Sequence, residues 1–162
     1  MKKVLLISAF SFIFLFLPGE ASACTCPPVV LVGGKPLKNF EQNVDEAFRK
    51  SSTVFAGRVL SVGRSRRNSA RGRNRGGVSE SGMTVTFRIE SVWKKKMPKH
   101  VTVYTGYSDA DCGFPFEVGE KYLVYAFGEK NLLVSACSRT KVFSDAAREI
   151  GVLDRLKDKR LK

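Results

Sequence analysis

Apolar residues recur with helical spacing in two segments of the chain. Residues 39–50 carry four apolar side chains spaced i, i+4, i+7 and i+8, which lie on one face of a short helix: Phe40, Val44, Ala47 and Phe48. Ser51 and Ser52 follow this segment and are predicted to end the helix. Near the end of the chain, Ser144 and Asp145 are suited to cap a final helix, whose inward face carries Ile150, Leu153 and Leu156.

A period of two residues marks the predicted strands. In residues 83–90, apolar side chains alternate with polar ones, as expected of a half-buried strand; the apolar positions are Met83, Val85, Phe87 and Ile89. The alternation slips at residues 91–93, which is typical of a bulge in a curved strand. Four further segments are predicted strands: 53–62, 100–105, 121–127 and 132–136. Residues 128–131 are predicted to form the hairpin turn between the last two.

Five short strands and two helices predict a mainly β fold of the α+β class. Two architectures fit this set of elements: a five-stranded OB-type barrel with two flanking helices, and a meander sheet with helices on one side. A length of 162 residues corresponds to about one domain. The apolar fraction of 43% is sufficient to bury a core.

Residues 1–23 are predicted to be a secretory signal peptide. Lys2 and Lys3 supply a positive start, residues 4–17 are apolar apart from two serines, and Ala21-Ser22-Ala23 fits the small-x-small cleavage pattern. A membrane anchor is the alternative, but a spanning helix needs about 20 apolar residues. Cleavage before residue 24 predicts a secreted protein, extracellular or periplasmic, with no membrane span in its mature form.

A lipoprotein is the second alternative for the same segment. Ala21-Ser22-Ala23-Cys24 loosely resembles a lipobox, and lipidation at Cys24 would anchor the protein to a membrane. It would also leave three cysteines, an odd number, in an oxidising compartment, whereas four cysteines form pairs. We therefore expect the domain to occupy residues 24–162 with its first cysteine unmodified.

Charge and histidine content narrow the range of functions. The chain has 28 Lys and Arg against 15 Asp and Glu, a formal net charge of +13, which favours an anionic partner. A single histidine excludes mechanisms that need two imidazoles. That residue, His100, lies beside lysines without a recognisable nucleophile motif, so it is predicted to be a surface residue. We predict no enzymatic activity and no cofactor.

Much of the positive charge is concentrated in one loop. Residues 63–82 connect two predicted strands, and the first part of this loop carries six arginines without an acid: Arg64, Arg66, Arg67, Arg71, Arg73 and Arg75. One interpretation is a contact with a polyanion, such as an anionic surface polymer. The other is a solvated, disordered loop that keeps a sheet edge soluble. A second basic cluster, residues 94–96 with Lys99, is typical of an exposed turn.

The four cysteines are arranged for disulfides in an exported protein. Cys24 and Cys26 lie at the start of the predicted mature chain, and a bond between them is disfavoured because its ring would be strained. Each therefore pairs with Cys112 or Cys137, in an order that the spacing leaves open. Neither zinc-ribbon spacing nor a C-x-x-C redox motif is present, so a structural zinc and a redox role are minor alternatives.

Six segments follow one another in an order found in one protein family. The first is Cys24-Thr25-Cys26-Pro27-Pro28, and the others are 54–59, 85–94, 111–114, 120–126 and 132–138. Together they resemble the inhibitory domain of the tissue inhibitors of metalloproteinases, within the wider netrin-like superfamily. The resemblance implies an OB-type five-stranded barrel with flanking helices. It also implies disulfides between Cys24 and Cys112 and between Cys26 and Cys137.

The same resemblance implies a metalloendopeptidase inhibitor that acts in trans on a zinc metalloendopeptidase, and we expect the protein to be a monomer. In that family the α-amine and carbonyl of the first cysteine chelate the catalytic zinc of the protease, a role that falls here to Cys24. Thr25 would enter the protease pocket for the residue after the scissile bond. Further contacts would come from Cys26, Pro27, Pro28, Ala110, Asp111, Cys112 and Gly113. The inhibitor itself would hold no intrinsic metal.

Two features differ from the family pattern. The family continues with His-Pro-Gln where this chain has Val29-Val30-Leu31, and a third disulfide of the domain is missing. A shared fold does not establish a shared function. The alternative is a netrin-like binding module without inhibitory activity, whose basic loop would hold an anionic envelope polymer, a glycan or extracellular nucleic acid.

Overall fold

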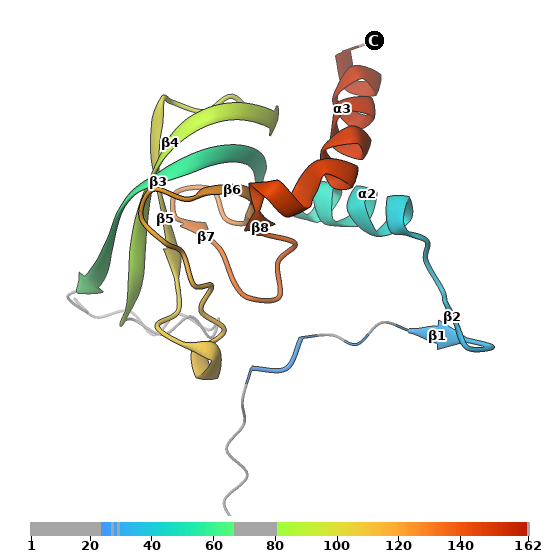
Figure 1. Cartoon of the computed structure of the whole chain (residues 1–162), viewed down its shortest axis with the longest axis horizontal. Coiled ribbons are helices and arrows are strands. Elements are labelled where there is room, and N and C mark those ends of the chain that lie inside the picture. The colour runs from blue at the N-terminus through green and yellow to red at the C-terminus, as the bar shows by residue number, and fades with distance from the viewer. Residues whose placement is uncertain (1–23, 27, 29, 67–80, 162) are drawn as a thin grey trace, which may run out of the picture.

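The computed structural model describes residues 24–26, 28, 30–66 and 81–161 (Figure 1). In chain order the elements are β1 (Leu31–Val32), β2 (Lys35–Pro36), α2 (Phe40–Lys50), β3 (Thr53–Arg66), β4 (Ser81–Lys94), β5 (His100–Thr105), the 3-10 turn η2 (Asp109–Asp111), β6 (Lys121–Ala126), β7 (Leu132–Leu133), β8 (Lys141–Val142), the 3-10 turn η3 (Phe143–Ala146) and α3 (Ala147–Leu161). The predicted signal peptide lies outside the described residues.

One six-stranded sheet forms the body of the domain, in the order β7-β5-β4-β3-β6-β8. All its neighbours are antiparallel except β5 and β7, which are parallel. The mixed α+β class with mainly strands and two helices is confirmed. The five-stranded barrel is not confirmed, because the sheet has six strands and is not closed.

The two long strands bend where their register shifts. β3 and β4 pair over most of their length, with irregularities at Val54/Phe55, Ala56/Gly57 and Val59/Ser61. The first two shifts skip Trp93 and Glu90 on β4, so the bulge predicted near residues 91–93 is present. An extra residue on one strand increases its twist and bends it, which curls the sheet around its own core.

The hairpin predicted between residues 121–127 and 132–136 forms only next to its turn, where Phe127 and Leu133 exchange both backbone hydrogen bonds at 2.8–2.9 Å. The strand β7 is only two residues long and pairs in parallel with β5, while a single bridge joins Phe127 to Leu133. The reason is that β6 already has a neighbour on each edge, β3 and β8. The edge of β5 is therefore the one that receives β7, and the backbone N–H of Val134 extends the contact by donating to the carbonyl oxygen of Tyr104 at 2.8 Å.

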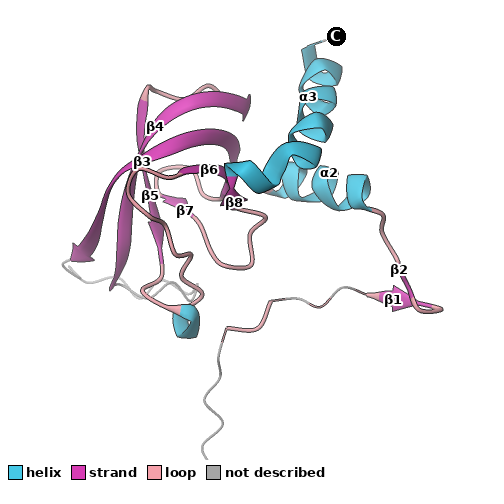
Figure 2. Ribbon diagram, viewed as in Figure 1, coloured by secondary structure: helices cyan, strands magenta, loops and turns pink. Residues whose placement is uncertain are grey.

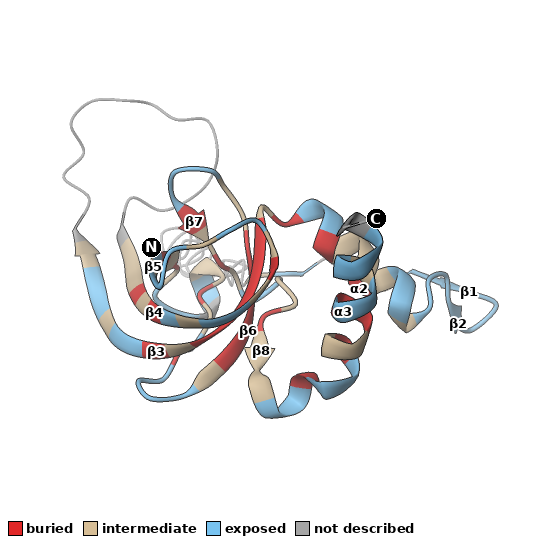
Figure 3. Ribbon diagram, turned by 90° about the horizontal axis from the view of Figure 1, so that it is seen from above, coloured by how far each residue is buried: buried red, intermediate tan, exposed pale blue. Residues whose placement is uncertain are grey.

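The core has two parts because alternate residues of the sheet point to opposite faces. On β6, Tyr122 and Val124 enter the first part, inside the curl of the sheet, while Leu123 and Tyr125 enter the second, beneath the helices. Figure 2 shows α2 and α3 together on one side of the sheet, and Figure 3 shows β6 buried between the two parts. Among the described residues, neither helix is long and apolar enough to cross a bilayer.

The N-terminus of α2 is capped by a side chain, whereas α3 continues directly from the 3-10 turn η3. Asn39 caps α2 through a reciprocal pair of 2.9 Å hydrogen bonds with Gln42, which satisfies backbone N–H groups at the helix start. Ser144 and Asp145 were predicted to cap the final helix but lie within η3, which leads into α3. Leu153 of α3 is fully buried, and Ile150 and Leu156 of the same helix pack at the edge of the same core, as predicted.

Both strands that border the Arg-rich loop are longer than predicted. β3 continues to Arg66 and β4 begins at Ser81, with pairs from Gly63↔Thr84 to Arg66↔Ser81. The predicted loop of residues 63–82 is therefore strand at both ends. Residues 67–80, which carry Arg67, Arg71, Arg73 and Arg75, lie outside the described residues.

Candidate functional site

Two disulfides attach the first described residues to the sheet. Cys24 is bonded to Cys112 and Cys26 to Cys137, each with a Cα–Cα distance of 5.1 Å, across 88 and 111 residues of sequence. This is the pairing that the family resemblance implies. In the chain-entropy model, bridges closing loops of this length each stabilise the fold by up to about 4–5 kcal/mol. The segment that begins at Cys24 is thus fixed at two points that lie two residues apart.

The sulfur atoms lie close together in space. Those of Cys24 and Cys137 are 3.7 Å apart, although they belong to different disulfides, and the sulfur of Cys112 lies within 4.8 Å of both. Zinc binds cysteine as a thiolate, and all four cysteines are oxidised here. The cluster is a covalent attachment point, and the alternatives of a structural zinc and a redox cysteine are not supported.

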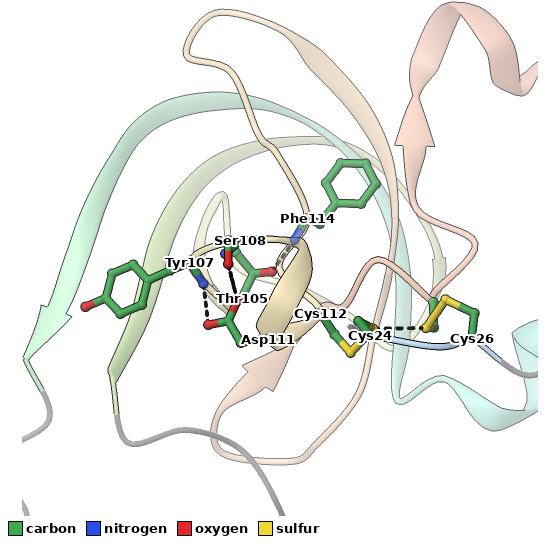
Figure 4. The surroundings of a disulfide bond; sticks show 9 residues. Cys24, Cys26, Thr105, Tyr107, Ser108, Asp111, Cys112 and Phe114 are labelled. Carbon is green, nitrogen blue, oxygen red and sulfur yellow. Dashed lines mark hydrogen bonds between the residues drawn. A yellow bond between two sulfur atoms is a disulfide. The ribbon is translucent and has the colours of Figure 1, made fainter. Parts of the chain in front are cut away.

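A tight turn presents Cys112 to Cys24 (Figure 4). Asp111, in η2, accepts hydrogen bonds of 2.7 Å from the backbone N–H groups of Tyr107 and Ser108. These two bonds lower the pKa of the Asp111 carboxyl, which is therefore ionised at neutral pH. The next residue, Cys112, has φ of +58°, a left-handed conformation uncommon outside glycine. The turn thus aims Cys112 back toward the N-terminal segment.

Two glycines make this turn possible. A Cβ atom on Gly113 would meet the carbonyl oxygen of Gly106 at 2.5 Å, and one on Gly106 would meet the carbonyl oxygen of Asp111 at 2.5 Å. Only glycine fits at positions where backbone approaches backbone this closely. Gly113 is buried by this contact, so its role is to shape the turn. Gly113 is also among the predicted contacts with a partner, and that contact stays a prediction.

The other predicted contact residues lie on or near the surface. Thr25, Cys26, Pro28 and Ala110 are exposed, whereas Cys24, Asp111 and Cys112 are half-buried. Pro27 lies outside the described residues. The disulfide brings the Cys24 segment beside η2, so the structure places these sequence-distant residues at one site, which we call the N-terminal ridge.

A pocket of about 220 Å³ lies beside this ridge and was not foreseen from the sequence. Its walls come from β3, β4 and the segment after β5, and include Val62, Met83, Thr105, Tyr107, Gly113 and Phe114. Phe116, at the base of the same segment, is buried and packs edge-to-face on Phe87. Phe114 packs against Phe116 with a ring-centroid distance of 4.6 Å.

Basic residues also form a row across the outer face of the sheet. His100 pairs with Arg88, Arg88 with Arg58, and Arg58 with Lys121, so four strands contribute neighbouring residues. We call these four residues the cationic row. Glu90 lies among them, with its carboxylate 2.8 Å from Lys121. Hydrogen bonding to Lys121 lowers the pKa of Glu90, so it remains charged within the row.

The sequence had assigned the basic residues differently. Arg64 is exposed on β3, and Arg66 ends that strand, but the rest of the arginine loop is not described. The sequence places Lys94 in a basic cluster at an exposed turn. In the structure, its amine instead donates to the carbonyl oxygens of Phe48, Arg49 and Ser51 at 2.5–2.9 Å. It closes the end of α2. His100 is exposed, as predicted.

The comparisons with known proteins add no assignment, since the chain matches no protein-family model and no curated protein.

Proposed function

We propose that this protein is an inhibitor of zinc metalloendopeptidases, and not an enzyme, that binds its target through the N-terminal ridge. One observation carries the proposal: the half-cystine expected to become the mature N-terminus, Cys24, is attached by a disulfide to Cys112 beside a rigid, exposed turn. Termini normally fray. A terminus fixed at two points and left at the surface is suited to being presented to a partner.

The proposed chemistry needs a free α-amine on Cys24, which cleavage of the predicted signal peptide after Ala23 would generate. A catalytic zinc keeps one coordination position open for water. The amine and carbonyl of Cys24 would together displace that water from the zinc of the target. An α-amino group has a pKa of about 7.7–8.0, so it loses its proton to a metal readily near neutral pH.

The remaining ridge residues would set the fit to the protease. Thr25 is exposed next to Cys24 and would enter the pocket for the side chain after the scissile bond. Cys26, Pro27 and Pro28 would continue along the cleft, while Ala110, Asp111 and Cys112 would contact it from η2. Disulfides on both sides of Thr25 limit the entropy lost on binding. We propose an OB-type netrin-like scaffold for this arrangement.

The decisive experiment alters only the amine. Mature protein beginning at Cys24 is compared with protein carrying one added alanine before it, and inhibition is assayed with a matrix metalloproteinase catalytic domain and with thermolysin. The proposal predicts inhibition by the first protein and a loss of at least 100-fold with the second. Equal inhibition by both proteins would show that chelation by Cys24 is not the mechanism.

A second candidate function rests on the cationic row. The three cations and the histidine of this row lie side by side around the carboxylate of Glu90. The loop that follows β3 carries further arginines in the sequence. Such an arrangement attracts a polyanion and releases its counterions. The protein would then be a non-inhibitory module that holds an anionic surface polymer.

Salt dependence separates the two candidates. Binding of inorganic polyphosphate is measured between 50 and 200 mM salt for the mature protein and for Arg58→Gln with Arg88→Gln. Each lost contact should reduce the slope of log affinity against log salt by about 1. The pair Lys96→Gln with Lys130→Gln removes the same charge elsewhere and serves as the control. Equal slopes for both double variants would reject the cationic row as the binding surface.

A further inference from the structure

A small apolar hairpin follows the Cys24–Pro28 segment in the chain and projects from the domain just before α2 (Figure 1). Strands β1 and β2 are joined by Gly33 and Gly34, whose φ angles of +59° and +76° fit a two-residue type I′ turn. Figures 1 and 3 both show the hairpin standing away from the sheet and the helices. We call residues 30–37 the N-terminal hairpin.

The N-terminal hairpin exposes aliphatic side chains on both faces. Val30, Leu31, Val32 and Leu37 are each 58–62% exposed. Val32 lies opposite Lys35 and Leu31 opposite Pro36, so alternate residues place valine on one face and Leu31 with Pro36 on the other. A hairpin that packs on its own domain needs only one apolar face. Apolar residues on both faces indicate insertion between two walls of a partner.

The backbone of the hairpin is open on one edge only. Leu37 donates to the carbonyl of Val30 at 2.9 Å, so these two residues form a hydrogen-bonded pair. Pairs alternate along antiparallel strands, and the N–H and C=O of Leu31 therefore point outward from β1. On the other strand, Pro36 has no N–H to offer. A partner strand can add beside β1 but not equally beside β2.

This open edge distinguishes a protein partner from a lipid one. Hydrocarbon cannot satisfy outward-pointing backbone groups, and open sheet edges do not occur within the lipid core. Lys35, next to the turn, would also have to enter with the tip of the hairpin. A protein groove that is bordered by a strand satisfies both the aliphatic side chains and the backbone of Leu31.

The position of the hairpin identifies which protein meets it. Cys26 is fixed by its disulfide to Cys137, and Val30 follows four residues later, within about 14 Å of fully extended chain. Any protease that covers residues 24–28 must therefore face the base of the hairpin. The hairpin also occupies the place where the resemblance to the inhibitor family breaks off, at Val29-Val30-Leu31.

We propose that the N-terminal hairpin is a second docking element, which inserts Leu31 and Val32 into an apolar, strand-bordered groove of the metalloendopeptidase beside its active-site cleft. This inference rests on the proposed inhibitory function. The hairpin adds a second contact with the same protease, and this contact does not involve the zinc. It therefore contributes mainly to the lifetime of the complex and to the choice of target.

The test compares four forms of the mature protein: unchanged, Leu31→Asn with Val32→Thr, Leu60→Asn, and unchanged with one alanine before Cys24. Leu60 is an exposed leucine on β3 and serves as the matched control. Inhibition constants and dissociation rates are measured with a matrix metalloproteinase catalytic domain and thermolysin. The hairpin variant should raise the inhibition constant about 10–100-fold against at least one protease, through faster dissociation. Leu60→Asn should change it less than twofold.

The outcomes separate the hairpin from the chelation mechanism. If the hairpin variant inhibits as strongly as the unchanged protein, the hairpin contact is overturned and the proposed function stays intact. Protease binding that the alanine-extended form keeps and the hairpin variant loses would uphold the hairpin contact even if chelation fails. Absence of both inhibition and hairpin-dependent binding would overturn both proposals.

Two further measurements address other occupants. The unchanged and hairpin-variant proteins are sedimented with 3:1 phosphatidylethanolamine–phosphatidylglycerol vesicles, and their masses in solution are determined by sedimentation velocity. Hairpin-dependent vesicle binding would assign the hairpin to a membrane, and a hairpin-dependent dimer would assign it to a second copy of this chain. Either result would overturn the assignment to a protease. Unchanged circular dichroism would show that the exposed substitutions leave the fold intact.

Discussion

The backbone N–H of Ala136 donates to the carbonyl oxygen of Cys112 at 2.9 Å. This bond holds the segment before Cys137 against the turn that carries Cys112. Cys112 and Cys137, the cysteines to which Cys24 and Cys26 are bonded, are consequently neighbours in space, although they are far apart in sequence. Any change on either side should be transmitted to the N-terminal ridge, and the predictions for the Cys24–Cys112 disulfide and for Gly113 follow from this arrangement.

Removal of the Cys24–Cys112 disulfide should abolish tight inhibition. The double variant Cys24→Ser with Cys112→Ser keeps the α-amine and carbonyl of residue 24 but frees them from the turn, so the entropy of ordering them returns as a cost of binding. We expect the inhibition constant to rise at least 100-fold and the free energy of unfolding to fall by about 2–5 kcal/mol. Urea unfolding and inhibition assays measure both effects. An unchanged inhibition constant would mean that the attachment serves stability alone.

Inhibition should weaken as the pH falls. A protonated α-amine has no lone pair for zinc, so binding must release a proton below the amine pKa of about 7.7–8.0. The inhibition constant should rise about tenfold for each pH unit below that value. It is measured between pH 6 and 8.5, with a hydroxamate inhibitor as the control for changes in the protease. A profile that parallels the hydroxamate would contradict chelation by the amine.

Alanine at position 113 should disturb the ridge, whereas alanine at position 63 should not. The added methyl of Gly113→Ala would lie 2.5 Å from the carbonyl oxygen of Gly106, but that of Gly63→Ala would make an ordinary 3.4 Å contact with Thr84. We expect Gly113→Ala to cost about 1–3 kcal/mol of stability through overpacking and to weaken inhibition. Thermal unfolding and inhibition assays compare the two variants. Equal stability of both would show that the turn relaxes without loss.

The buried carboxylate of Glu149 should anchor α3 in a pH-dependent manner. Its side chain is 1% exposed and lies 2.7 Å from both Arg139 and Lys141, and Tyr125 donates to it at 2.7 Å. Burial by itself raises the pKa of Glu149, but the hydrogen bonds from Arg139, Lys141 and Tyr125 outweigh it and lower the pKa below 4.5. We expect Glu149→Gln to cost about 2–3 kcal/mol at pH 7.

The sign of the pH effect follows from that lowered pKa. The folded state binds this proton less readily than the unfolded state, so the stabilisation is complete above the unfolded pKa and is lost as pH falls through the folded pKa. Urea unfolding between pH 7 and 3 should show a steeper decline for the unchanged protein than for Glu149→Gln. Parallel declines would place the acid sensitivity elsewhere.

Lys94 should contribute to stability through the end of α2. Its amine is within 2.9 Å of three carbonyl oxygens, those of Phe48, Arg49 and Ser51, and cations at a helix C-terminus are favourable. Lys94→Met should lower the free energy of unfolding by about 1.5–3 kcal/mol. Lys96→Met removes the same charge from an exposed position and should have little effect. Equal urea midpoints for the two variants would contradict the capping role.

The sequence predicts correctly those helices and strands whose apolar spacing and capping residues all lie within a few neighbouring positions. The helix after Asn39 was predictable because its apolar stripe lies next to a side chain that can cap it. The strand at residues 83–90 was predictable because its alternation matches one buried face. The hairpin at residues 31–36 was missed, although Gly33-Gly34 between aliphatic residues is a recognisable type I′ signal.

Long-range geometry decided the rest. The spacing of the cysteines limited each N-terminal cysteine to two partners and the family resemblance implied one order, and the folded chain forms the bonds in that order. Likewise, only the occupied edges of β6 explain why Leu132 pairs with β5, and only the end of α2 explains the role of Lys94. Residue type and spacing act over one turn or one strand. Disulfide choice, strand order and the partners of buried charges depend on which distant segments the folded core brings together.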